Sequence, residues 1–236
     1  MMQWGRFRTW SAAALARRSL LAERKRAWGY YQRVAPKLDV SWGSKKPTDT
    51  VARFSKHILA SKNGGARLKY LEIGAFEGRS AAFVHSLLDG NVDITVIDDF
   101  DLNPEIADSL MRSAFSKFKA NMAAIGAGSS VEVIKGQSAQ HLPRLLADKR
   151  YFDIIFIDGS HATLDVIVDA AMSFKLLVAG GLMIFDDYWY RRLDIGRGYR
   201  PKLAIDGFVG AMCHEIDVLD VAAQVFIRKR RTERRW

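Results

Sequence analysis

The stretch from 151 to 188 limits the possible folds of this chain more than any other segment. It contains two short apolar runs, 154–157 and 182–185, separated by a longer segment, 162–177, whose apolar residues recur at helical spacing. Runs of about four branched residues are too short for helices and are typical of buried parallel strands. Gly180-Gly181 follows the helical segment, where glycine commonly stops a helix. The stretch therefore predicts a strand, a crossover helix ending at the glycines, and a second strand parallel to the first.

Acidic residues end both predicted strands. Asp158 follows the first apolar run, and Asp186 and Asp187 follow the second. Because such strand–helix–strand units are right-handed and the carboxyl ends of parallel strands share one sheet edge, we expect the three carboxylates to lie beside each other. Three acids in one place suggest a cation site. Each acid alone has a structural alternative, since Asp158 could cap the following helix and the Asp186-Asp187 pair could belong to a turn.

The rest of the sequence repeats the alternation of short apolar runs with amphipathic segments. We expect strands at 68–73, 92–97 and 131–134, helices at 47–62, 80–88, 104–122, around 142–146 and at 202–213, and two final strands at 216–221 and 224–227. The two-residue link between the final strands favours an antiparallel hairpin. The pattern predicts an α/β fold: a doubly wound, mostly parallel seven-stranded sheet with an antiparallel edge hairpin and an N-terminal helical extension.

Length and composition favour one domain. With 236 residues, about half of them apolar, the chain can fill one α/β domain plus an extension but hardly two domains. We divide it into a basic N-terminal helical arm, 1–46, a domain, 47–228, and a basic C-terminal tail, 229–236. The single cysteine, Cys213, excludes an internal disulfide framework and suits a reducing compartment, so we expect a cytoplasmic location. We find no membrane-span or secretory pattern.

The formal net charge of +10 comes from the two ends of the chain. Residues 1–35 carry eight Lys and Arg against one acid, and residues 226–236 carry six against one, so that 36–225 has a net charge of −2. Basic ends of this kind are more often solvated than functional, although contact with phosphates or an anionic membrane stays open. For the N-terminal arm we expect a helix that docks on the domain; a mitochondrial presequence or an interfacial amphipathic helix are the alternatives.

A glycine-rich turn follows the first predicted strand of the domain. Its pattern, Glu72-x-Gly74-x-x-x-Gly78, differs from the spacing that binds dinucleotide pyrophosphates, and suits a ligand without phosphates. Asp98 ends the next strand about 20 residues later, where an acid takes the hydroxyls of a ribose. Glycines in such turns are also common for steric reasons alone. The two features in register strengthen the case for a nucleoside-containing cofactor.

At these residues the chain resembles the class I S-adenosylmethionine-dependent methyltransferases, which have a Rossmann-like fold. YLEIGAFEGRS looks like the first motif of that family, TVIDDF like its ribose-binding strand end, and GQSAQHLP like its segment bordering the adenine. The similarity covers roughly residues 68–228. The resemblance implies that S-adenosylmethionine is bound by a set of residues at these turns: Glu72, Gly74, Phe76, Gly78, Ser80, Asp98, Gln137, Ser138 and Asp158.

The segment FIDGSH…GGLMIFDDY is the more specific match, because it resembles the metal-dependent O-methyltransferases of the catechol and sugar-modifying types. The resemblance places Asp158, Asp186 and Asp187 at the positions of the ligands for Mg²⁺ or another divalent cation. It places His161 where catechol-type enzymes have a lysine base, so the base is either His161 or a metal-bound water. His161 and Asp158 are thus the expected catalytic residues.

We therefore expect an enzyme that methylates a hydroxyl of a small acceptor, either a sugar of a glycan or natural product or a catechol-like ring. The residues from Trp189 to Arg192 could form the wall of the acceptor site or simply pack on the domain. An RNA methyltransferase is the first alternative, but the near-neutral domain and the missing Asn-Pro-Pro-Tyr motif argue against nucleic acid as substrate. A non-catalytic binding module is the second. The oligomeric state, including a homodimer, stays open.

Overall fold

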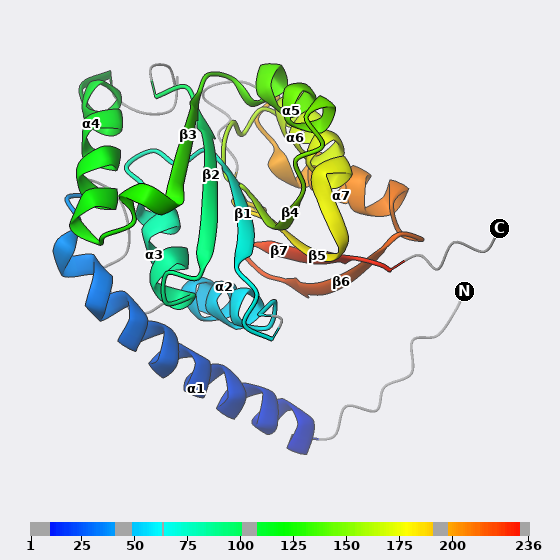
Figure 1. Ribbon diagram of the computed structural model, residues 1–236. Coiled ribbons are helices and arrows are strands. Elements are labelled where there is room, and N and C mark those ends of the chain that lie inside the picture. The colour runs from blue at the N-terminus through cyan, green and yellow to red at the C-terminus, as the bar shows by residue number, and fades with distance from the viewer. Residues whose placement is uncertain (1–9, 41–48, 63, 101–107, 191–197, 232–236) are drawn as a thin grey trace.

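The computed structural model describes residues 10–40, 49–62, 64–100, 108–190 and 198–231 (Figure 1). Its centre is one seven-stranded sheet with the order β3-β2-β1-β4-β5-β7-β6. The strands are β1 Leu68–Ile73, β2 Val92–Asp98, β3 Val131–Lys135, β4 Phe152–Ile157, β5 Leu177–Phe185, β6 Ile216–Val221 and β7 Val225–Lys229. The first five in the sheet are parallel, and β7 runs antiparallel to both β5 and β6. The predicted fold class, including the edge hairpin, is confirmed.

Helices cover both faces of the sheet (Figure 1). They are α1 Trp10–Val34, α2 Asp49–Leu59, α3 Arg79–Leu87, α4 Asp108–Ala124, α5 Ser138–Ala147, α6 Thr163–Leu176 and α7 Pro201–Ala211, with short 3₁₀ turns at Ala35–Lys37 and Gly128–Ser130. Helices α2, α3 and α4 share one buried apolar cluster with the sheet, and α5, α6 and α7 share another. The sheet is therefore buried on both sides, as its nearly continuous apolar strands require.

Alternation along the central strands divides these two clusters. Tyr70 and Ile154 face the α2–α4 layer, whereas their neighbours Leu71 and Ile155 face the α5–α7 layer, and all four are fully buried. Successive side chains of a strand point to opposite faces, so each central strand supplies both cores. This packing fixes the sheet register, and the register in turn fixes the positions of the turns at the strand ends.

The boundary between α6 and β5 differs from the prediction. The helix ends at Leu176, and β5 begins at Leu177 and continues through Gly180 and Gly181. The two glycines therefore do not stop the helix. They lie beside a register irregularity between β4 and β5, where the backbone of Gly180 has a φ of 85°. A β-bulge next to glycine satisfies the same sequence pattern as a helix stop.

Other element ends agree with the prediction to within a few residues, as expected for frayed termini. The second hairpin strand is Val225–Lys229 rather than 224–227. The predicted start of the 104–122 helix lies outside the described residues, and the described part of this helix, α4, begins at Asp108.

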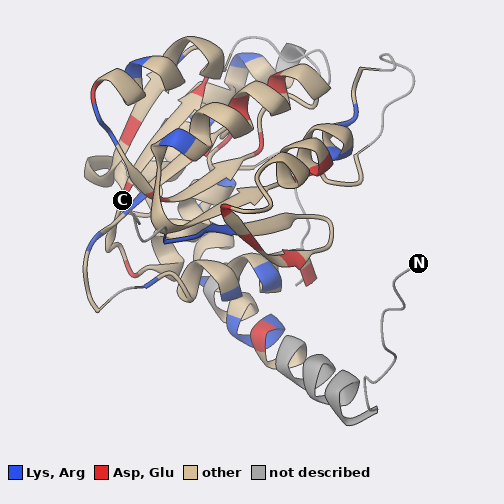
Figure 2. Ribbon diagram, turned by 90° about the vertical axis from the view of Figure 1, so that its right-hand side faces the viewer, with Lys and Arg blue, Asp and Glu red and all other residues tan. Residues whose placement is uncertain are grey.

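Helix α1 lies along α2 and α3 at the outside of one helical layer (Figure 1). Ala27 and Val34 on its C-terminal half are buried. Lys and Arg lie among Asp and Glu over the helices and strands of the domain, whereas the charged residues of the described part of α1 are mostly Lys and Arg (Figure 2). Within the same residues, no helix combines the length and apolar character of a membrane span.

Candidate active site

The turns that follow β1, β2, β3, β4 and β5 meet at one edge of the sheet. Backbone hydrogen bonds join them: Gly74 N–H donates to Ile97 O at 2.9 Å, Gly136 to Asp98 O at 3.0 Å, Asp158 to Ile73 O at 2.8 Å and Asp186 to Ile157 O at 3.0 Å. Carboxyl ends of parallel strands are the usual ligand-binding edge of such sheets. All the residues predicted from the sequence to bind cofactor or metal therefore lie in or beside one group of connected turns.

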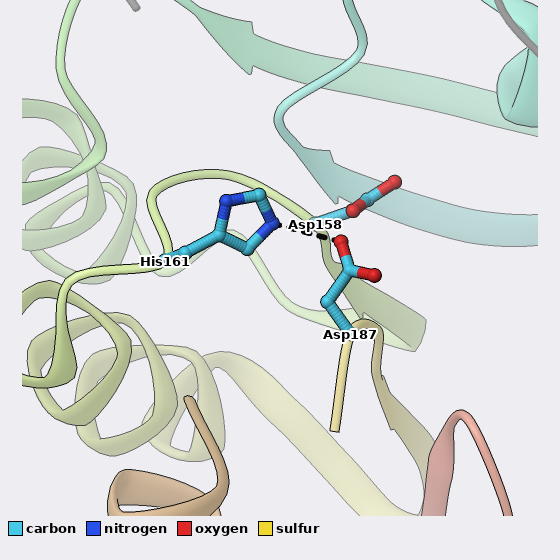
Figure 3. Close-up of side chains that lie close together, drawn as sticks. All are labelled: Asp158, His161 and Asp187. Atoms are coloured by element: carbon cyan, nitrogen blue, oxygen red, sulfur yellow. Dashed lines mark hydrogen bonds and ion pairs between the residues drawn. The ribbon is translucent and has the colours of Figure 1, made fainter. Parts of the chain in front are cut away.

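Asp158, His161 and Asp187 form the group best suited to a metal ion (Figure 3). One ligand atom from each lies within 4.8 Å of the others, and all three side chains are partly exposed. The Nε2 atom of His161 is 2.8 Å from Oδ2 of Asp187. Asp187 has a left-handed backbone with a φ of 51°, uncommon for a residue other than glycine, which turns its side chain toward His161. Strain of this kind is characteristic of functional turns.

Asp186, the third predicted ligand, points elsewhere. Its Oδ1 accepts a hydrogen bond from the backbone N–H of Asp187 at 2.8 Å, and its Oδ2 accepts one from Nε2 of Gln224 at 3.0 Å. The compact group is thus made of two of the predicted acids and His161. Gln224 in the β6–β7 link was not predicted, because a lone glutamine in a hairpin carries no sequence signal.

Crowded carboxylates dominate the electrostatics of this edge. Burial, followed by the nearby charges of Asp186 and Asp187, raises the pKa of Asp158 well above its ordinary range. Burial and the charge of Asp187 raise the pKa of Asp186 to about 6. Carboxylates that disfavour each other's ionisation this way are stabilised by a cation placed between them. A hard divalent ion with oxygen ligands fits this donor set.

Glu72 at the end of β1 is completely buried behind the following turn. The hydroxyl of Ser80 in α3 donates a hydrogen bond to its Oε1. Burial raises the pKa of Glu72 to about 8, so that the folded protein holds it largely protonated at neutral pH. Glu72 and Ser80 were both predicted to bind cofactor, but they are hydrogen-bonded to each other. This bond joins the end of β1 to the start of α3 and so supports the turn between them.

Asp98 organises the same turn from the neighbouring strand. Its Oδ2 accepts hydrogen bonds from the backbone N–H groups of Ala75 and Phe76 at 2.6 and 2.8 Å, and its Oδ1 accepts one from Phe100 N–H at 2.8 Å. A carboxylate oxygen has two lone pairs. The Oδ1 atom can therefore still accept one hydroxyl, which is compatible with the predicted contact to a ribose, while the rest of the carboxylate shapes the turn.

The glycines of the turn are required by packing within the protein. A Cβ atom on Gly74 would lie 2.2 Å from the carbonyl oxygen of Asp158, and one on Gly78 would lie 2.8 Å from the side chains of Phe118 and Met122. Both glycines also have φ near 80°. They allow the end of β1 to lie tightly against α4 and against the turn at Asp158 that follows β4. Phe76, between the two glycines, has a left-handed φ of 48°. We call residues 74–78 the cofactor loop.

The predicted adenine-bordering residues lie at the start of α5. Gln137 is exposed, whereas the hydroxyl of Ser138 is bonded to Asp169, an acid on α6 that is only 2% exposed. Ser138 is thus committed to a bond between two helices. Sequence reasoning missed Asp169, which stands in an amphipathic helix without any motif around it.

Comparison with known proteins places this geometry in a family. A profile described as a methyltransferase domain matches residues 71–188, half of the chain. The chain belongs to this methyltransferase family. The match begins in β1 and ends one residue after the Asp186-Asp187 pair, and it thus contains the cofactor loop and the whole metal-site group. The methyltransferase class predicted from the sequence is confirmed.

Relatives and solved structures agree with the family. An O-methyltransferase of Aspergillus hancockii, hkm8, is 27% identical over 125 residues, covering 52% of this chain and 44% of the relative. The chain spans about half the length of the curated relatives it matches. MycE is a methyltransferase from the mycinamycin biosynthetic pathway, solved with Mg, SAH and mycinamycin VI. It superposes with a TM-score of 0.58 at 19% identity, over 89% of this methyltransferase and 56% of MycE. An O-methyltransferase from Bacillus cereus in complex with SAH gives 0.58 at 18% identity, over 89% and 91%.

Three aromatic residues, Tyr188, Trp189 and Tyr190, directly follow Asp187. The Tyr190 ring is stacked on His161, with centroids 4.1 Å apart and planes at 16°. Trp189 is 63% exposed. Tyr188 is buried, and its hydroxyl donates to Asp206 at 2.8 Å. Of the predicted acceptor wall, Tyr190 therefore borders the site and Trp189 faces outward, whereas Arg191 and Arg192 lie outside the described residues.

Proposed function

We propose that this protein is an S-adenosylmethionine-dependent O-methyltransferase that uses Mg²⁺ or another divalent cation and methylates a hydroxyl of a small sugar or phenol. The observation that carries the proposal is the group of Asp158, His161 and Asp187 beside the cofactor loop. The family match supports methyl transfer, and the relative named an O-methyltransferase supports oxygen as the acceptor atom. MycE, solved with Mg and SAH, shows that a protein of this fold can hold both.

The cofactor is assigned to the turns after β1, β2 and β3. S-adenosylmethionine, when bound, supplies the methyl group on an electrophilic sulfonium. The cofactor loop lies against it, Asp98 accepts a hydroxyl of its ribose through the second lone pair of Oδ1, and Gln137 borders its adenine. Glu72 and Ser80 support the loop and Ser138 supports the start of α5, so these three residues affect cofactor binding indirectly, through the parts that they hold in place.

The cation is assigned to Asp158 and Asp187, with Asp186 beside them. When bound, such an ion lowers the pKa of a coordinated acceptor hydroxyl. Mg²⁺ prefers oxygen ligands, which leaves the nitrogen of His161 for proton transfer. If the Nε2–H group of His161 donates to Asp187, the Nδ1 atom is the one that accepts the proton of the acceptor. Tyr190 holds the imidazole plane while this happens.

Titration of S-adenosylhomocysteine into the purified protein is the first test, with Mg²⁺ and with a chelator. Binding is expected in both buffers, and tighter binding with Mg²⁺ would indicate neighbouring sites. A folded sample that binds no S-adenosylhomocysteine in either buffer would refute the assignment and favour a non-catalytic module.

Asp158→Ala and Asp187→Asn test the metal mechanism. Each should lower Mg²⁺-stimulated methyl transfer by about 100-fold or more, a typical loss for a group that stabilises transition-state charge, and leave affinity for S-adenosylhomocysteine within a few-fold. Asp165→Asn is the matched control, because Asp165 is an exposed acid in the first turn of α6. Its carboxylate accepts a hydrogen bond from Ser160. Turnover unchanged in both site variants would rule the metal mechanism out.

A further inference from the structure

The N-terminal arm reaches the cofactor loop through a buried asparagine of α4. Asn121 is 2% exposed, and its side-chain amide donates to the carbonyl oxygen of Glu77 at 2.8 Å and to that of Asp39 at 3.0 Å. Its Oδ1 accepts the backbone N–H of Asp39 at 2.8 Å. One side chain thus bonds the backbone of the cofactor loop to the backbone of the segment that follows α1.

Lys117, one helical turn earlier on α4, makes the same connection with side chains. Its Nζ lies 3.1 Å from Oε1 of Glu77 and 3.4 Å from Oδ1 of Asp39. The Glu77 side chain is almost completely buried, whereas that of Asp39 is 75% exposed. An exposed ion pair contributes little, so the two hydrogen bonds between Asn121 and Asp39 carry the connection to the arm. The third bond of Asn121 and the buried Lys117–Glu77 pair fix Glu77 to α4.

A second connection lies on the other side of Gly78. Arg79, the first residue of α3, donates from Nη2 to the hydroxyl of Tyr31 at 3.1 Å, and its guanidinium lies 5.3 Å from the Tyr31 ring centroid. The Tyr31 ring is itself held in α1 by Trp28, stacked at 5.2 Å, and against the domain by Phe83 at 6.3 Å. Of the two residues that flank Gly78, Arg79 is therefore bonded to the arm directly and Glu77 is linked to it through Asn121.

We propose that the described part of the N-terminal arm, residues 10–40, is a positioning element of the cofactor site, which it stabilises by holding Glu77 through Asn121 and Arg79 through Tyr31. The arm precedes the family match at residues 71–188, so this role belongs to a segment that the methyltransferase domain does not include. The left-handed backbone of Phe76 needs such external support, because strained turns persist only where their surroundings fix them. The inference rests on the proposed function, since it takes residues 74–78 as part of the cofactor site.

Two variants separate the two connections. Asn121→Ala removes the amide bonds to Glu77 and Asp39, and Tyr31→Leu removes the partner of Arg79. Each should weaken S-adenosylhomocysteine binding by about five- to ten-fold, the lower part of the range for coupled sites. The KM for S-adenosylmethionine should rise in proportion while kcat stays within about two-fold, because neither residue touches the reacting atoms.

Lys229→Met is the stability-matched control. Lys229 bonds carbonyl groups at the end of α6, remote in the fold from the arm and from the cofactor loop. A similar fall in melting temperature with unchanged S-adenosylhomocysteine affinity is expected for this variant. An equal loss of affinity in Lys229→Met would reduce the effect of the arm to general destabilisation and overturn the inference.

Reciprocity gives a test on the unaltered chain. If the arm stabilises cofactor binding, the cofactor must stabilise the docked arm by the same factor. Trypsin should cut the arm after Arg24, Lys25, Arg26 and Arg33 several-fold more slowly with saturating S-adenosylhomocysteine than without it. Cleavage at an equal rate, with ligand binding verified in the same sample, would overturn the inference, whereas a wild-type protein that binds no ligand would instead overturn the proposed function.

Discussion

Replacing Glu72 by glutamine should change how the stability of the protein depends on pH. Glu72 is 0% exposed, and burial raises its pKa from 4.5 to about 8. Between these two values the folded state holds a proton that the unfolded state has released. The folded state therefore binds more protons than the unfolded state, and the free energy of unfolding must fall as pH rises through this window.

The magnitude follows from the width of the window. At about 1.4 kcal/mol per pKa unit, a rise from 4.5 to about 8 corresponds to about 5 kcal/mol between pH 4 and pH 9, with no reduction for solvent because the group is fully buried. Glutamine has nearly the same size and cannot ionise. The free energy of unfolding of the variant, relative to that of the wild type, should consequently increase by up to about 1.4 kcal/mol per pH unit across the window.

Urea unfolding at pH 5, 6, 7, 8 and 9 in the presence of a chelator would measure this gain as the difference between the two unfolding free energies. Asp169→Asn provides a comparison, because burial raises the pKa of Asp169 only to about 6 and its difference should level off near that pH. A wild-type-minus-variant difference for Glu72→Gln that is constant from pH 5 to pH 9 would refute the buried, protonated state of this residue.

Two further substitutions test the packing. Lys229→Met removes hydrogen bonds of 2.8 Å from Nζ to the carbonyl oxygens of Phe174 and Leu177, where α6 ends. The loss of about 1–3 kcal/mol should lower the melting temperature by several degrees. An unchanged melting temperature would contradict this capping role. Gly74→Ala places a Cβ 2.2 Å from the Asp158 carbonyl oxygen at a φ of +81° and should cost about 3 kcal/mol or more in urea unfolding. Gly159→Ala should cost far less, because the nearest atom to its Cβ would be a methyl carbon of Ile73 at 3.2 Å.

The strands could be predicted from the sequence because buried parallel strands are short, apolar and end abruptly. The run Leu68–Ile73 before Gly74 and the run ending at Asp158 illustrate this, since both the strand and its last residue follow from the pattern. Glycine was ambiguous. Gly180-Gly181 fits a helix stop and a strand irregularity equally well, and only the pairing of β4 with β5 decides between them.

The site was predictable as a place, but the directions of its side chains were not. Asp186 and Asp187 are adjacent, so their side chains leave the backbone in different directions, and the left-handed turn at Asp187 decides which one meets His161. The roles of Asn121 and Asp169 could not be predicted from the sequence for another reason. Each is a single polar residue in a helix, and its importance arises from contacts with segments far away in the sequence.

The attachment of the arm has a consequence for how the chain is made. Asp39 and Asn121 are 82 positions apart, and the arm leaves the ribosome before α4. At about 5–20 residues per second, it waits roughly 4–16 s for its binding partner on α4 to be synthesised. During that interval the arm can pack on α2 and α3, which are synthesised before α4, but the hydrogen bonds between Asp39 and Asn121 cannot form. A nascent chain stalled before residue 121 should therefore leave the segment around Asp39 open to proteolysis, and one stalled well beyond it should protect this segment.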